Sequence, residues 1–92
     1  VALENADKGV TVNAICPGWV DTDLVAAQFQ ARADRDGVDF EEGKRSVIVE
    51  KQPMPKATPP SSLGDLALFL CSDAAATITG SSLPMDGGWT AQ

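Results

Sequence analysis

An apolar segment that stops at a Pro-Gly pair constrains the fold of this chain more than any other feature. Residues 10–16 read Val-Thr-Val-Asn-Ala-Ile-Cys, and Pro17, Gly18 and then polar residues follow. The segment is rich in β-branched residues and alternates little, which is typical of a parallel strand covered on both faces. Ligands of open α/β sheets bind beyond the carboxyl ends of the strands. The sequence therefore predicts an α/β fold with a binding site just after Cys16.

Helical segments are predicted on both sides of this strand. Gly9 and Gly37 are natural caps after two of them, and Asp39 with Glu42 forms a capping box before a third. Residues 53–60 are rich in proline and indicate a linker between helices. The helices are expected at residues 1–8, which resemble the last turns of a helix, at Leu24–Arg35, from Asp39 to Gln52, and over residues 63–71 with Ser61 or Ser62 as the cap.

A second strand is predicted at Ser81–Met85, with a sharp turn at Asp86-Gly87-Gly88. The order of elements favours two parallel strands joined by a helical crossover. Two strands do not make a stable parallel sheet, and an apolar strand without neighbours leaves an open edge. We therefore expect further strands from residues upstream of Val1, or from a second copy of the chain.

Charge and composition exclude several classes of protein. Thirteen acidic and seven basic residues give a net charge of -6, which argues against a nucleic-acid or anionic-membrane surface. No apolar stretch approaches the twenty or so residues that span a bilayer, and no segment of the sequence resembles a secretory leader, so a cytoplasmic location is expected. Cys16 and Cys71 have no histidine or third thiol to complete a metal site and are expected to be buried thiols. Asp21, Asp23 and Asp86 are expected to be solvated turn residues rather than metal ligands.

The chain has no Tyr and no His, so two common proton-transfer side chains are missing. The glycines also lack the spacing of a phosphate-binding loop. No catalytic residue is therefore assigned.

The two strand ends and the last helix carry a family resemblance. Residues 12–18, followed by Val20 and Thr22, resemble the end of the sixth strand in short-chain dehydrogenases. Residues 68–88 are similar to the last helix, last strand and final turn of that family, and Leu83–Gln92 most resembles the ending of its D-3-hydroxybutyrate dehydrogenases. The resemblance implies the C-terminal part of a Rossmann-type doubly wound parallel sheet. Residues 1–92 would then be part of one domain, with substrate-lid helices at 24–52 and the last helix, strand and interface tail at 61–92.

The resemblance also implies a site for the cofactor NAD after the first strand. The backbone from Pro17 to Val20 would face the nicotinamide, with the amide and carbonyl of Val20 holding its carboxamide. Thr22 would bind the carboxamide or the pyrophosphate. The candidate cofactor-binding residues are thus Pro17, Gly18, Trp19, Val20 and Thr22. From the residues alone, Pro17-Gly18 could equally be a plain turn, and Trp19 a packing residue rather than a pocket wall, while Trp89 reads as an interface residue.

Gln52, followed by Pro53, resembles the Gln-Pro pair of hydroxybutyrate dehydrogenases, whose amide binds the substrate carboxylate. The alternative is an exposed glutamine that ends a helix. Where that subfamily often continues Thr-Lys-Arg, this chain has Met54-Pro55-Lys56-Ala57, which is a departure in the lid.

Two functions follow from these observations. The first is the C-terminal portion of an NAD-dependent dehydrogenase acting on a small hydroxy acid. The family's glycine loop and its Asn, Ser, Tyr and Lys catalytic group belong upstream of these segments, so we expect no hydride transfer by this chain alone. The second is a non-catalytic remnant that survives by self-association. In both cases the last helix and strand, residues 63–70 and 81–85, are the expected contacts of a homo-oligomer.

Overall fold

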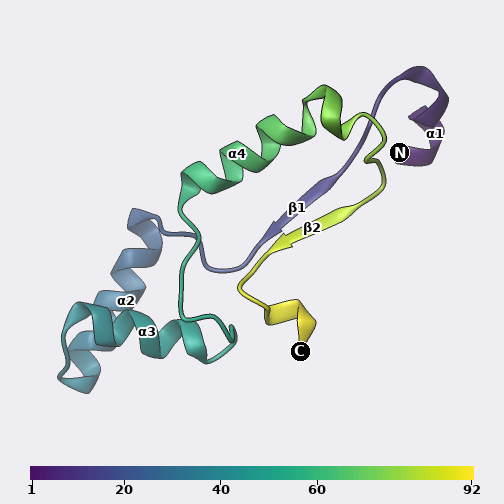
Figure 1. Ribbon diagram of the computed structural model, residues 1–92. Helices are drawn as coiled ribbons and strands as arrows, with labels where there is room; N and C mark the ends of the chain where they lie inside the picture. Colours follow the sequence, from purple (N-terminus) through teal and green to yellow (C-terminus); the bar gives the residue numbers. More distant parts are fainter.

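Two short parallel strands form the centre of the computed structural model, which describes residues 1–92. Strand β1 (Ala14–Pro17) pairs with β2 (Ser82–Met85), from Ala14 opposite Ser82 to Pro17 opposite Met85. The predicted parallel pairing is confirmed, and both strands end at the same edge of the sheet (Figure 1).

The first strand is shorter than the predicted Val10–Cys16, because before Ala14 side chains make most of the hydrogen bonds, beside one backbone bond from the Gly80 amide to the Val12 carbonyl at 2.8 Å. The Val12 amide donates to the Thr79 hydroxyl, and the Asn13 side chain donates to the Ile78 carbonyl and accepts from the Ser81 amide. The expected covering of both faces is also wrong. Ala14, Cys16 and Pro17 are exposed, since β2 and α4 are the only elements that accompany the strand.

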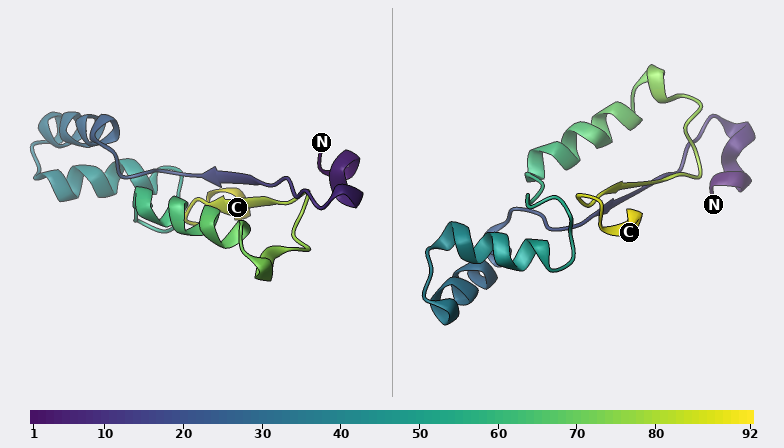
Figure 2. Two further views of the ribbon diagram at one scale, coloured as in Figure 1. Left: turned by 90° about the horizontal axis from the view of Figure 1, so that it is seen from above. Right: turned by 60° about the horizontal axis from the view of Figure 1, so that its bottom comes forward.

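Helix α4 (Pro60–Leu70) runs alongside the strand pair (Figures 1 and 2). The prediction that Ser61 or Ser62 caps it is wrong: Pro59 is the N-cap, Pro60 opens the helix, and no side chain bonds the first turn. Proline suits the first helical position because its φ is already helical and its missing N–H would have no partner there. The two serines therefore lie inside the first turn.

Helices α2 (Asp23–Asp36) and α3 (Phe40–Val49) pack on each other and stand off the carboxyl ends of the strands (Figure 1). The Asp39 side chain accepts from the Glu42 amide, as half of the predicted capping box, and Gly37 ends α2 in a left-handed conformation at φ 66°. Helix α3 stops at Val49, before the predicted end at Gln52.

The α2–α3 pair contains most of the core. Phe29, Ile48 and Ala57 form a buried cluster, and the rings of Phe29 and Trp19 lie 5.7 Å apart. The helices meet closely at Gly43, where an added Cβ would lie 2.7 Å from the Ala33 Cβ. The sequence marks Gly43 only as a weak helix former, whereas the packing requires the absence of a side chain.

The remaining elements are short. They are α1 (Ala2–Asn5), η1 (Ala6–Lys8), η2 (Asp73–Ala75) and η3 (Trp89–Ala91). Gly9, at φ 72°, ends the first helical segment as predicted. No helix is both long and apolar enough to cross a membrane.

The chain is extended and leaves much apolar surface open. Its radius of gyration is 16.9 Å, against about 12 Å for a compact domain of this length, and eight of its 92 residues are buried. Leu68 and Phe69 of α4 are 71% and 45% exposed. Cys16 and Cys71 are both exposed, so their predicted burial is wrong: neither strand nor helix has a second layer to cover it.

Candidate functional site

The turns after the two strands touch each other. The Gly18 amide donates to the Met85 carbonyl at 3.1 Å, which continues the ladder past the end of β1. A Cβ on Gly18 would lie 2.9 Å from the Asp86 Cα, so only glycine allows the two backbones to approach this closely. The Pro-Gly and Asp-Gly-Gly turns, far apart in the sequence, therefore form one continuous edge.

Gln52 fills the space against both turns and is 1% exposed. A Cβ on Gly18 would lie 2.6 Å from its Oε1, and a Cβ on Gly87 would lie 2.5 Å from its Nε2. The alternative of an exposed glutamine at a helix end is therefore wrong.

The Gln52 amide is fully engaged by the backbone. Its Oε1 accepts from the Trp19 amide at 3.3 Å, and its Nε2 donates to the carbonyls of Met54 at 3.0 Å and Lys56 at 2.6 Å. A buried amide is tolerated because its donors and acceptor are paired. Gln52 thus ties the Pro-Gly turn to the loop after α3.

Val20 is held by its neighbours and leaves its own backbone groups free. The Trp19 carbonyl accepts from the Thr58 amide at 2.8 Å, and the Asp21 amide donates to the Thr58 carbonyl at 2.9 Å. In this parallel bridge the N–H and C=O of Val20 point to the opposite side, and neither bonds another residue of the chain. One residue therefore presents a donor and an acceptor together, the complement of a primary carboxamide.

The other predicted cofactor residues surround Val20 in sequence and differ in what they offer. Thr22 is the N-cap of α2: its hydroxyl oxygen accepts from the Val25 amide at 3.3 Å, while the hydroxyl hydrogen is donated to no residue of the chain. Trp19 packs on Phe29, and its indole N–H is buried without a partner. Pro17 ends β1 and Gly18 faces β2, so their contribution is the shape of the edge.

Asp86 is buried rather than solvated, which corrects the prediction for this residue, whereas Asp21 and Asp23 are exposed as predicted. The Asp86 carboxylate accepts hydrogen bonds from the amides of Gly88 and Thr90, each at 3.1 Å, and from the Thr90 hydroxyl at 2.7 Å. The Thr90 hydroxyl in particular holds the pKa of Asp86 below its usual value, against the opposing effect of burial. This hydrogen bonding fixes the turn after β2.

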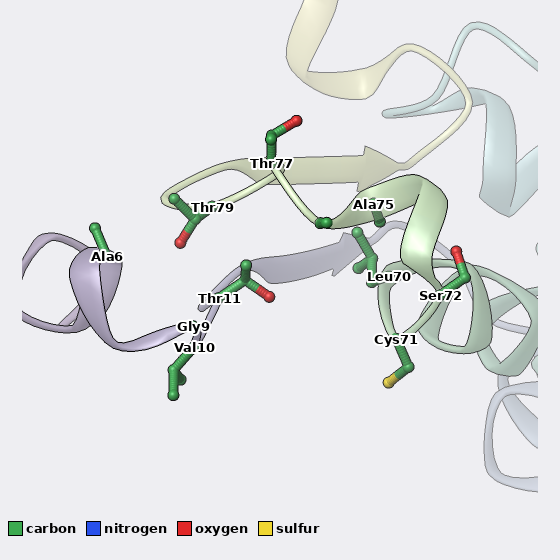
Figure 3. A pocket seen from close by; sticks show the side chains of 11 residues that line it. Ala6, Gly9, Val10, Thr11, Leu70, Cys71, Ser72, Ala75, Thr77 and Thr79 are labelled. Atoms are coloured by element: carbon green, nitrogen blue, oxygen red, sulfur yellow. The ribbon is translucent and has the colours of Figure 1, made fainter.

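A hollow on the surface of the molecule lies away from this edge. It has a volume of about 540 Å³, sits beside the amino ends of both strands, and is lined by small and apolar residues such as Val10, Leu70 and Ala75, with no charged side chain (Figure 3). No three His, Cys, Asp or Glu side chains gather to hold a metal ion. The candidate site is the edge at the carboxyl ends of the strands, where the two glycine turns meet.

Thr58 is the residue of the site that the sequence did not reveal. It lies in the Pro-rich stretch that reads as a linker, yet it holds both neighbours of Val20, and its hydroxyl donates to the Met85 carbonyl at 3.2 Å. A single β-branched residue among prolines was the only available signal. Its pairing with residue 20 depends on contacts 38 positions apart, which the sequence does not display.

Comparisons with known proteins identify the family of the chain. A family model described as enoyl-(acyl carrier protein) reductase matches residues 1–90. Two relatives named D-beta-hydroxybutyrate dehydrogenase, from Cupriavidus necator and Rhizobium meliloti, are 53% and 48% identical over 99% and 100% of this chain. The chain spans only 35% and 36% of the length of these relatives.

Solved structures show the same fold. A short-chain dehydrogenase family protein from Francisella tularensis matches with a TM-score of 0.80 and 37% identity, over 99% of this chain and 37% of the other. A 4-hydroxyisoleucine dehydrogenase complexed with NADH matches with a TM-score of 0.78 and 32% identity, over 99% of this chain and 33% of the other. These matches define a segment of a Rossmann-type α/β fold. The chain belongs to the short-chain dehydrogenase/reductase family, as its sequence motifs indicate.

Proposed function

We propose that this chain forms the nicotinamide-binding edge and the substrate lid of an oxidoreductase that transfers hydride between 3-hydroxybutyrate and NAD. The single observation that carries the proposal is the free donor and acceptor of Val20, held in place by Thr58 at the carboxyl ends of the strands. The identity of 53% to a D-beta-hydroxybutyrate dehydrogenase supports the substrate. The cofactor, when bound, would accept or return the hydride.

The residues fit a nicotinamide carboxamide in number and kind. Val20 offers one N–H and one C=O, and Thr22 adds a hydroxyl hydrogen that no residue of the chain accepts. Gly18 keeps the approach to this edge free of a side chain. These groups would orient the carboxamide, while these 92 residues contain no Tyr, the family's usual acid/base residue.

Gln52 is proposed to bind the substrate carboxylate. Both of its amide hydrogens are donated to backbone carbonyls, so binding requires release of the Met54 or the Lys56 carbonyl. An anion is a stronger acceptor than a neutral carbonyl, which favours the exchange once the substrate is present. Movement of the loop after α3 would therefore accompany substrate binding.

A chimera tests the proposal. The matching C-terminal third of the Cupriavidus necator relative is replaced by this chain, and NAD reduction by 3-hydroxybutyrate is measured. We expect kcat/KM within about tenfold of the parent enzyme. A folded chimera of the same oligomeric state that does not reduce NAD would contradict the proposal.

Val20→Pro in the chimera tests the observation that carries the proposal, the free N–H of Val20. The change removes an N–H that bonds nothing in the chain, so the fold should persist. Loss of one hydrogen bond to the carboxamide, together with the proline Cδ in the place of the amide hydrogen, should raise KM for NAD at least about threefold. Thr11→Pro is the matched control, because the Thr11 amide also bonds no other residue and lies near the amino end of β1, away from the site.

We propose as a second candidate a non-catalytic chain that self-associates through α4 and β2. The exposed Leu68 and Phe69 favour it, as does the small buried core. A homo-oligomer through these elements is also our proposal for the enzyme. Sedimentation of the 92-residue chain should give an oligomer that Leu68→Glu dissociates. Titration with NADH, followed by Trp19 fluorescence, separates the two functions. A folded oligomer that does not bind NADH supports the non-catalytic chain.

A further inference from the structure

The α2–α3 pair depends on few connections for its position. The two helices pack on each other and stand away from the strands and from α4 (Figures 1 and 2). They join the rest of the chain through residues 18–22 on one side and through the loop after Val49 on the other. Contacts that hold this loop therefore decide where the helices lie.

The segment after β2 makes those contacts. The Gly87 carbonyl accepts from the Met54 amide at 3.0 Å, and the Gln92 side chain donates to the Lys51 carbonyl at 2.7 Å. Gly88 lies against the Pro53 ring, where an added Cβ would be 3.5 Å from the Cγ. Residues 51, 53 and 54 are thus held, one after another, by residues 87–92.

Asp86 gives this segment its shape. Its carboxylate accepts from the Gly88 and Thr90 amides and from the Thr90 hydroxyl, which folds residues 86–91 into a turn followed by η3. The same residue abuts Gly18 at the cofactor edge. One buried carboxylate therefore shapes both the cofactor edge and the segment that holds the loop after α3.

We propose that residues 86–92 act as a latch that positions the α2–α3 pair over the strand ends, with Asp86 and Gln92 as its positioning residues. The latch sets the closed position of the lid, and so the affinity for substrate rather than for cofactor. This role in substrate binding rests on the proposed function, whereas the latch itself does not.

Amide hydrogen exchange of the 92-residue chain tests the latch without any ligand. Gln92→Ala removes the bond to Lys51 from an exposed position, so the fold should be kept. We expect the Gln52 and Met54 amides to exchange about fivefold faster, with no change in α4. Gln30→Ala is the matched control, since it removes a glutamine hydrogen bond to Asp34 on the exposed face of α2. Equal exchange in both variants would overturn the latch.

Kinetics of the chimera test the role in substrate binding. Gln92→Ala, which lies away from the cofactor edge, should raise KM for 3-hydroxybutyrate about fivefold or more, while kcat and KM for NAD change less than twofold. An unchanged KM for 3-hydroxybutyrate, or a KM for NAD and a kcat that change as much as it does, would overturn this role. If the unmodified chimera is inactive the proposed function fails, and the exchange measurement still decides whether the latch exists.

Discussion

Replacing Gln52 by leucine should destabilise the chain strongly. The side chain is 1% exposed and bonds three backbone groups: the Trp19 amide, the Met54 carbonyl and the Lys56 carbonyl. Leucine keeps much of the volume between the two glycine turns but leaves all three groups without a partner. Each lost hydrogen bond is worth about 1 kcal/mol, so the free energy of unfolding should fall by about 3 kcal/mol. This is a large share even of the roughly 5–14 kcal/mol typical of a compact domain of this length, and this chain is extended with only eight residues buried.

Urea unfolding followed by tryptophan fluorescence measures the change, with Trp89→Phe as the background so that Trp19 alone reports. Gln30→Leu is the control, because it loses one exposed hydrogen bond and should change the free energy of unfolding by less than about 0.5 kcal/mol. If Gln52→Leu and Gln30→Leu unfold at the same urea concentration, Gln52 does not join the turns as described.

Three further changes test the local structure. Gly43→Ala places a Cβ 2.7 Å from the Ala33 Cβ, so α2 and α3 must separate; thermal unfolding should show a lower Tm although alanine is the better helix former. Asp39→Ala removes the N-cap bond of α3 and should cost about 1 kcal/mol in urea unfolding, while Asp39→Asn, which keeps an acceptor, should cost little. The pKa of Asp86 is lower in the folded chain than in the unfolded one, so ionised Asp86 stabilises the fold fully above the unfolded pKa of about 3.9, and this stabilisation is lost as pH falls through the folded pKa. Between pH 6 and pH 2 the Tm of Asp86→Asn should therefore fall less steeply than the Tm of the unmodified chain. Identical slopes would contradict this role of Asp86.

Much of the fold follows from local rules that the sequence displays. Gly9 and Gly37 end helices in left-handed conformations, and Asp39 begins α3, because caps and glycines act on the backbone within a few residues. The period of apolar residues predicts α2 to within one residue at each end. Parallel pairing of the strands follows from the helical segments between them.

Burial, in contrast, was decided by tertiary structure. An apolar strand and two cysteines predict a covered sheet, but covering needs a second layer, and in these 92 residues only α4 and β2 accompany β1. The prediction for Asp86 is wrong in the opposite direction. The sequence Asp-Gly-Gly is typical of a solvated turn, yet Asp86 is buried because backbone N–H groups of the same turn surround its carboxylate.

The site divides in the same way. The sequence by itself determined the Pro-Gly and Asp-Gly-Gly turns and their place after strands, since proline and glycine restrict the backbone locally. Only the tertiary structure decided that the turns touch, that Gln52 fills the space between them, and that Thr58 leaves the N–H and C=O of Val20 free. Those arrangements join residues more than thirty positions apart, and such contacts arise from packing and hydrogen-bond partners that no local pattern encodes.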